Sequence, residues 1–126
     1  MKAEHKTKWI EALRSGNYTQ GHGFLKYTSI NGIVKYCCLG VLCEVLKDEL
    51  GLIESESLDG SWSFNGSRMF PPHVDALTLP TDATQKLVYL NDNRGQSFPA
   101  IADWIETNVP TDTETEAETK AIHPTD

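Results

Sequence analysis

The hydrophobic pattern changes its period at Cys37, and this change is the strongest constraint on the fold. Upstream, the strand-like runs 24–30 and 33–36 flank Asn31-Gly32, a dipeptide that supplies the two positive φ values of a type I′ turn. Downstream, apolar residues recur every three or four positions over 37–50, which is the spacing of an amphipathic helix. The sequence therefore predicts a β-hairpin that leads directly into a largely buried central helix.

The rest of the chain carries weaker but similar signals. Residues 4–15 have helical spacing around Trp9, and a second hairpin is predicted where 61–64 and 68–70 flank Asn65-Gly66. Further along, 73–77 has the pattern of one short turn. Asp82 can N-cap a helix that runs to residue 90, residues 91–95 interrupt it, and Ser97 can cap a last helix.

These elements predict a single small α+β domain over residues 1–108, in which two short antiparallel hairpins pack on a central helix and two C-terminal helices close the core. Residues 109–126 contain five acidic side chains, one lysine and no aromatic residue, so we expect an acidic, disordered tail. No apolar run is long enough to span a membrane, and a cytoplasmic location is expected. The sequence leaves open whether the chain forms a homo-oligomer.

The cysteines allow two interpretations. The chain has three cysteines, and Cys37 and Cys38 lie where the strand gives way to the helix. A helix N-terminus can lower the pKa of a thiol, and Cys37 or Cys38 with His73 and Asn91 would form a catalytic set in the chain order of papain-like folds. Free cysteines are also common in cores, and in that interpretation Cys38 and Cys43 pack inside while Cys37 lies at the edge of the hairpin.

Metal and nucleic-acid sites are not indicated. The cysteines lack zinc-ligand spacing and the four histidines are scattered, so neither a metal nor another cofactor is expected. Asn91 and Asp92 fail the register of a calcium loop and suit capping and turn formation. The segment 90–105 has the pattern of a helix–turn–helix motif. Its second predicted helix carries no lysine or arginine, which argues against binding to duplex nucleic acid.

A ligand pocket is the remaining candidate site. Gly21-His22-Gly23 is a flexible loop that exposes its backbone and could accept an anion. If the hairpins face the first helix, a pocket could be lined by five polar or aromatic side chains: Tyr18, Gln20, His22, Trp62 and Arg68.

Three motifs resemble a group of small, mostly uncharacterised phage and prophage proteins. They are Trp9 with Ser-Gly-Asn-Tyr-Thr-Gln over 15–20, Tyr-Cys-Cys-Leu-Gly-Val-Leu-Cys-Glu over 36–44, and Leu-Asn-Asp at 90–92 followed by Ser-Phe-Pro-Ala-Ile-Ala-Asp-Trp-Ile-Glu over 97–106. The likeness covers about residues 6–108. It implies a phage origin and a small α+β domain, and it implies no activity.

We therefore expect a non-enzymatic phage accessory protein that binds a host protein or a small nucleotide-like signal and thereby antagonises host defence. A cysteine-dependent hydrolase or transferase is the first alternative. An acidic mimic of nucleic acid, acting through residues 109–126, is the second.

Overall fold

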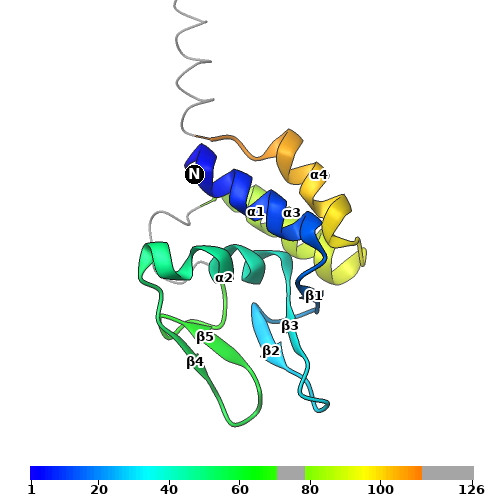
Figure 1. Cartoon of the computed structure of the whole chain (residues 1–126). Helices are drawn as coiled ribbons and strands as arrows, with labels where there is room; N and C mark the ends of the chain where they lie inside the picture. The colour runs from blue at the N-terminus through cyan, green and yellow to red at the C-terminus, as the bar shows by residue number, and fades with distance from the viewer. Residues whose placement is uncertain (71–78, 112–126) are drawn as a thin grey trace, which may run out of the picture.

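The protein has the predicted α+β class in a computed structural model that describes residues 1–70 and 79–111 (Figure 1). In chain order the elements are α1 (Ala3–Ser15), β1 (Thr19–Gln20), β2 (Lys26–Thr28), β3 (Val34–Tyr36), α2 (Cys38–Leu50), β4 (Glu54–Glu56), β5 (Trp62–Phe64), α3 (Thr81–Val88), the π-helix η2 (Tyr89–Asn93) and α4 (Phe98–Asn108). Helices α1, α3 and α4 lie together at one end, and the strands extend from α2 at the other (Figure 1). The turn predicted over 73–77 lies outside the described residues.

The core is built around Trp9 and the apolar face of α2. Trp9 is fully buried in α1, and its indole N–H donates to the carbonyl of Cys38 at 2.9 Å, so the polar atom of this large side chain is satisfied. Leu42 and Leu46 of α2 are also fully buried, as is Ile101 of α4. The amphipathic helices predicted over 4–15 and 37–50 are confirmed.

The first sheet has one strand more than the predicted hairpin. Strand β3 pairs with β2 in antiparallel register, with Tyr27 opposite Lys35. It also pairs in parallel with the two-residue strand β1, with Thr19 opposite Lys35, which gives the order β1-β3-β2. A two-residue strand has no period to detect, so β1 was not predicted.

The turn of the first hairpin differs from the predicted type I′. Gly32 has a φ of +80°, but Asn65 is the only non-glycine residue with positive φ in the described chain, so Asn31 does not supply the second positive value. The amide of Gly32 donates to Ser29 at 2.9 Å, and that of Ser29 donates to Ile33 at 2.8 Å. This is a three-residue loop that ends in a left-handed glycine, a common alternative to the two-residue turn.

The second hairpin uses β4, a strand that the sequence pattern did not indicate. Asn65 and Gly66 have φ values of +51° and +80°, and Phe64 and Ser67 exchange backbone hydrogen bonds, so the tight turn is confirmed. Strand β5 nevertheless pairs with β4, with Ser55 opposite Ser63, and no strand forms over 68–70. The prediction of 68–70 as the partner strand was wrong because the acidic residues of β4 concealed its strand character.

A buried cation explains how these acidic residues are accommodated. The Lys26 side chain is only 6% exposed, and its ammonium lies 2.8 Å from Glu54 of β4 and 3.1 Å from Glu44 of α2. Lys47 pairs with the same two carboxylates. Burial lowers the pKa of Lys26, but the hydrogen bonds that its ammonium donates to Glu54 and Glu44 outweigh this effect and raise that pKa. The network joins β2, α2 and β4 through complementary charges.

The C-terminal helices lie close to their predicted positions. Ser97 caps α4 by accepting from the amide of Ala100, as predicted. Helix α3 continues into the π-helix η2, which the sequence pattern does not indicate. Val109 and Thr111 are buried, so the packed structure continues beyond residue 108. None of the described helices has the length and apolar character of a membrane span.

Candidate functional site

An open cleft of about 330 Å³ lies between the start of α2, the end of α3, residues 23–25 before β2 and residues 68–70 after β5. Its apolar walls include Phe24, Leu39, Met69 and Val88. Its polar groups include the Cys37 thiol, the Arg68 guanidinium and the Asp92 carboxylate. A mostly apolar concavity with few polar groups is the usual form of a small-ligand site.

Cys37 is the N-cap of α2, and its position is fixed by backbone contacts. Its amide donates to Leu25 at 3.2 Å, and its Sγ accepts from the amide of Gly40 at 3.4 Å. Burial raises the pKa of the Cys37 thiol to about 11, and the backbone hydrogen bonds from Gly40 and Leu39 do not offset this effect. The thiol in the cleft is therefore neutral at physiological pH, which agrees with the packing interpretation and not with the catalytic one.

The other two thiols are core groups. Cys38 and Cys43 are fully buried, and burial raises the pKa of both. The Sγ of Cys38 contacts the carbonyl of Leu87 at 3.7 Å. The prediction that Cys38 and Cys43 pack in the core is confirmed. Cys37, which was predicted at the edge of the hairpin, is partly buried and directly follows β3.

Asn91 connects three segments behind the cleft. Its side-chain Nδ2–H group donates to the carbonyl of Gly21 and to the carboxylate of Asp92, each at 2.8 Å. Its Oδ1 accepts from the Gln20 side chain at 3.0 Å and from the amide of Cys38 at 3.2 Å. Asn91 therefore caps the start of α2 from a distant part of the chain, whereas the sequence indicated a local turn or cap.

The same hydrogen bonds position one rim of the cleft. Asp92, which follows the buried Asn91 in η2, accepts from the amide of Gly23 at 3.1 Å. The loop 21–23 is thus fixed at both ends, because Gly21 also donates to Tyr36 at 2.7 Å. A π-helical turn frequently marks a functional position, and here it places Asn91 inward and Asp92 at the cleft.

The predicted catalytic set is only partly brought together. Asn91 reaches the backbone of Cys38 and not a thiol, and His73 lies outside the described residues. Within 1–70 and 79–111, neither Cys37 nor Cys38 has a histidine among its hydrogen-bond partners. These contacts are those of packing and capping groups.

Of the five predicted ligand-binding residues, Arg68 is the one among the lining residues of this cleft. Arg68 lines the cleft, and Gln20 supports it through Asn91. Tyr18 packs edge-on against Tyr36 with ring centroids 5.3 Å apart. His22 is exposed beside Gly23, which lines the cleft.

Trp62, the fifth of these residues, belongs to the ion network. Its ring lies 4.0 Å from the Lys26 ammonium, and its N–H donates to Thr28. Sequence reasoning missed the apolar walls, of which Phe24, Met69 and Val88 are more than two-fifths exposed. A large exposed apolar side chain cannot be recognised before the tertiary structure is known.

Fold and site define a small α+β domain with an apolar cleft beside a cysteine-capped helix. The chain belongs to the family described as a domain of unknown function, DUF8296, whose model matches residues 1–74. The matched region contains the motif at 36–44 and the walls of the cleft at 23–25 and 68–70. No curated protein and no solved structure was found to match the chain.

Proposed function

We propose that the protein is a non-enzymatic accessory protein of a phage, that it acts by binding in the cytoplasm of the host cell, and that the cleft is its binding site. The phage origin rests on the resemblance at residues 9–20, 36–44 and 90–106. The observation that carries the binding role is the apolar cleft whose one thiol has a pKa of about 11. A neutral thiol is a poor nucleophile, but it can make apolar contacts with a ligand.

The polar groups of the cleft favour a small nucleotide-like signal as the ligand. Phe24, Leu39 and Val88 offer apolar contact for a flat base. Arg68 supplies a guanidinium for a phosphate, and Asp92 supplies a carboxylate for hydroxyl or amino groups. One arginine in this cleft suits a ligand with one phosphate group better than a polyphosphate.

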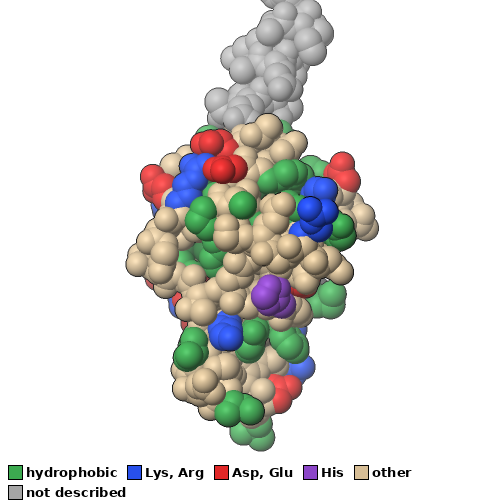
Figure 2. Space-filling view, turned by 90° about the vertical axis from the view of Figure 1, so that its right-hand side faces the viewer, with side chains coloured by type: hydrophobic (Ala, Val, Ile, Leu, Met, Phe, Trp, Pro, Cys, Tyr) green, Lys and Arg blue, Asp and Glu red, His purple; other side chains and the backbone are tan. Residues whose placement is uncertain are grey.

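Duplex nucleic acid is not the proposed ligand. The protein has a net charge of −7, and on the face drawn in Figure 2 the lysines and arginines lie in separate small groups with acidic residues among them. Binding along a phosphate backbone depends on a continuous row of cations. This charge pattern supports a compact ligand over a polymer.

We expect nucleoside 5′-monophosphates to shift the amide signals of Gly23, Cys37 and Val88 in a two-dimensional NMR titration of the full chain. Val88→Trp fills the cleft from an exposed position and should abolish the shifts. Arg68→Gln should weaken monophosphate binding at least tenfold, while it leaves binding of the uncharged nucleosides unchanged. Lys86→Gln is the matched control, because Lys86 lies on the same helix α3 and does not line this cleft.

Shifts that persist in Val88→Trp, or that map away from the cleft, would contradict the assignment of the site. Absence of shifts with every monophosphate would contradict the class of ligand.

A host protein is the second candidate partner, and a separate surface favours it. Ile30 and Leu58 are fully exposed at the tips of the two hairpins. The two tips are joined by a hydrogen bond of 2.7 Å from the backbone N–H of Thr28 to the carbonyl of Gly60. Two apolar side chains on one supported surface are typical of a contact with another protein. Ile30→Asp with Leu58→Asp should abolish such a contact and leave the NMR titration of the cleft unchanged.

A further inference from the structure

We propose that His5, Glu4 and Glu49 bind a divalent transition-metal ion, with Zn²⁺ as the preferred ion. Each residue offers one ligand atom, and the three atoms lie within 4.8 Å of one another. The centre of such a triangle is no more than about 2.8 Å from each atom. Zn²⁺ binds nitrogen and oxygen ligands at about 2.0–2.2 Å, so small side-chain movements would complete the site.

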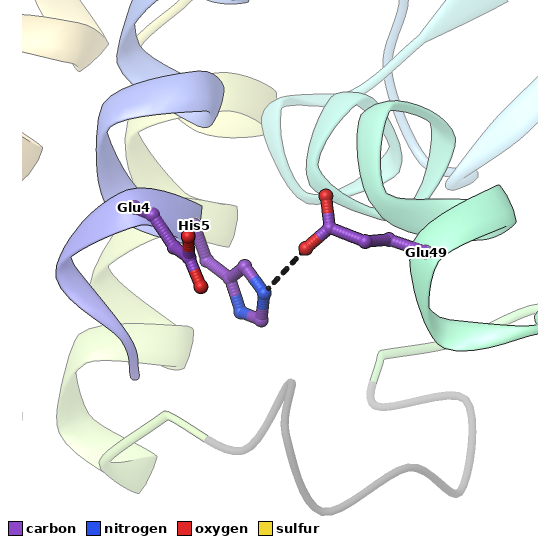
Figure 3. Close-up of side chains that lie close together, drawn as sticks. All are labelled: Glu4, His5 and Glu49. Carbon is purple, nitrogen blue, oxygen red and sulfur yellow. Dashed lines mark hydrogen bonds and ion pairs between the residues drawn. The ribbon is translucent and has the colours of Figure 1, made fainter.

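The site joins two helices that are packed together. Glu4 and His5 belong to the first turn of α1, and Glu49 belongs to the last turn of α2 (Figure 3). In Figure 3 the imidazole stands between the two carboxylates, and a dashed line marks its contact with Glu49. His5 is 2% exposed, whereas Glu4 and Glu49 are exposed. The ring is therefore held in place, and both carboxylates lie at the surface, where an ion can reach them.

The hydrogen bonding of the imidazole is incomplete without a further partner. Nε2 of His5 lies 3.0 Å from Oε2 of Glu49. Among the described residues, Nδ1 of His5 is the one buried side-chain nitrogen or oxygen that lacks a hydrogen-bond partner. Such groups are rare in folded proteins and require an explanation. Because only Nε2 is engaged, by its contact with Glu49, an ion at Nε2 would replace a single hydrogen bond of His5.

A neighbouring lysine leaves the site available. Lys8 is paired with Oε1 of Glu49, while Oε2 faces His5. Glu49 can bind the ion through Oε2 and keep Lys8 on Oε1.

The donor set determines the class of ion. One imidazole nitrogen and two carboxylate oxygens leave one position of a tetrahedral ion for water, which suits Zn²⁺ and its probe Co²⁺. Ca²⁺ and Mg²⁺ prefer sets of six or more oxygen ligands. His5 and Glu49 are 44 positions apart in the chain, so their proximity depends on the packing of α1 on α2.

The test uses the full chain without a histidine tag, titrated calorimetrically with Zn²⁺. We expect one ion per chain and a melting temperature that rises with the Zn²⁺ concentration, because the ion binds only the folded state. Glu4→Gln and Glu49→Gln should each weaken binding at least tenfold and reduce the rise in melting temperature. Both positions are exposed, so these variants should fold. Glu11→Gln is the control, because Glu11 is an exposed glutamate of the same helix outside the site.

Absence of Zn²⁺ binding would overturn the proposal, and so would an affinity that is unchanged in both Glu4→Gln and Glu49→Gln. The Co²⁺ complex should show visible bands without a thiolate charge-transfer band. A thiolate band would overturn the assignment by placing the ion on a cysteine.

Discussion

Gly40→Ala is expected to prevent stable folding, the largest effect of any single substitution considered in this protein. A Cβ on Gly40 would lie 1.6 Å from the carbonyl oxygen of Leu25 and 2.5 Å from its carbonyl carbon. Both atoms are backbone, so no side-chain rotation can relieve the overlap. The start of α2 would have to separate from the segment before β2, where the amide of Cys37 binds the same Leu25 carbonyl. We expect a loss of more than about 4 kcal/mol in urea unfolding.

Gly51→Ala is the matched control at the other end of the same helix. Gly51 has a φ of +66°, and a Cβ there meets no atom within 4 Å. Only the strain of the left-handed conformation applies, about 1–2 kcal/mol. A loss for Gly40→Ala no larger than that for Gly51→Ala would show that α2 does not contact Leu25 so closely.

Asn91→Ala is expected to cost about 3–4 kcal/mol of unfolding free energy. Asn91 is fully buried, and its loss leaves the amide of Cys38 and the carbonyl of Gly21 without their partner. Each buried polar group left unpaired costs about 1–3 kcal/mol, and the removed side chain also leaves a cavity. Chemical denaturation followed by circular dichroism measures the change.

Two further variants make this prediction specific. Asn91→Asp keeps the acceptor but loses the donor to Gly21 and places a charge beside Asp92, so it should destabilise as strongly as Asn91→Ala. Asn93→Ala should change stability by less than about 0.5 kcal/mol, because Asn93 is an exposed residue of the same π-helix. Equal effects at positions 91 and 93 would contradict the role of Asn91.

The sequence predicted the helices well because their apolar spacing reflects burial directly. Trp9 and Leu42 lie where the spacing placed them, on buried faces of α1 and α2. The strands were harder, since each has three residues or fewer and a short strand carries little pattern. Strand β4 was missed because its acidic residues do not look like a strand in the sequence. Glu54 is neutralised by Lys26 and Lys47, which are 28 and 7 positions away.

The candidate site was less predictable than the fold. The sequence singled out Cys37, Gln20, Arg68 and Asn91, yet their roles depend on contacts between distant segments. Gln20 meets Asn91 across 71 positions, and this contact has no local signal. The thiols were predicted to be packed, with a reactive thiol as the alternative, because the dipole of a helix favours the thiolate while burial opposes it. Only the tertiary structure determines that burial prevails.

The thiols of residues 36–44 cap and pack α2, and this arrangement supports our proposal that the protein acts by binding. The rate of Cys37 alkylation by iodoacetamide in the folded full chain, measured against pH with peptide mass mapping, tests it most directly. A pKa of about 11 in place of 9.0 predicts that Cys37 reacts about 100-fold more slowly near neutral pH than in the unfolded chain. Rapid modification at neutral pH, with an apparent pKa below about 8, would contradict the account and favour a cysteine-dependent enzyme.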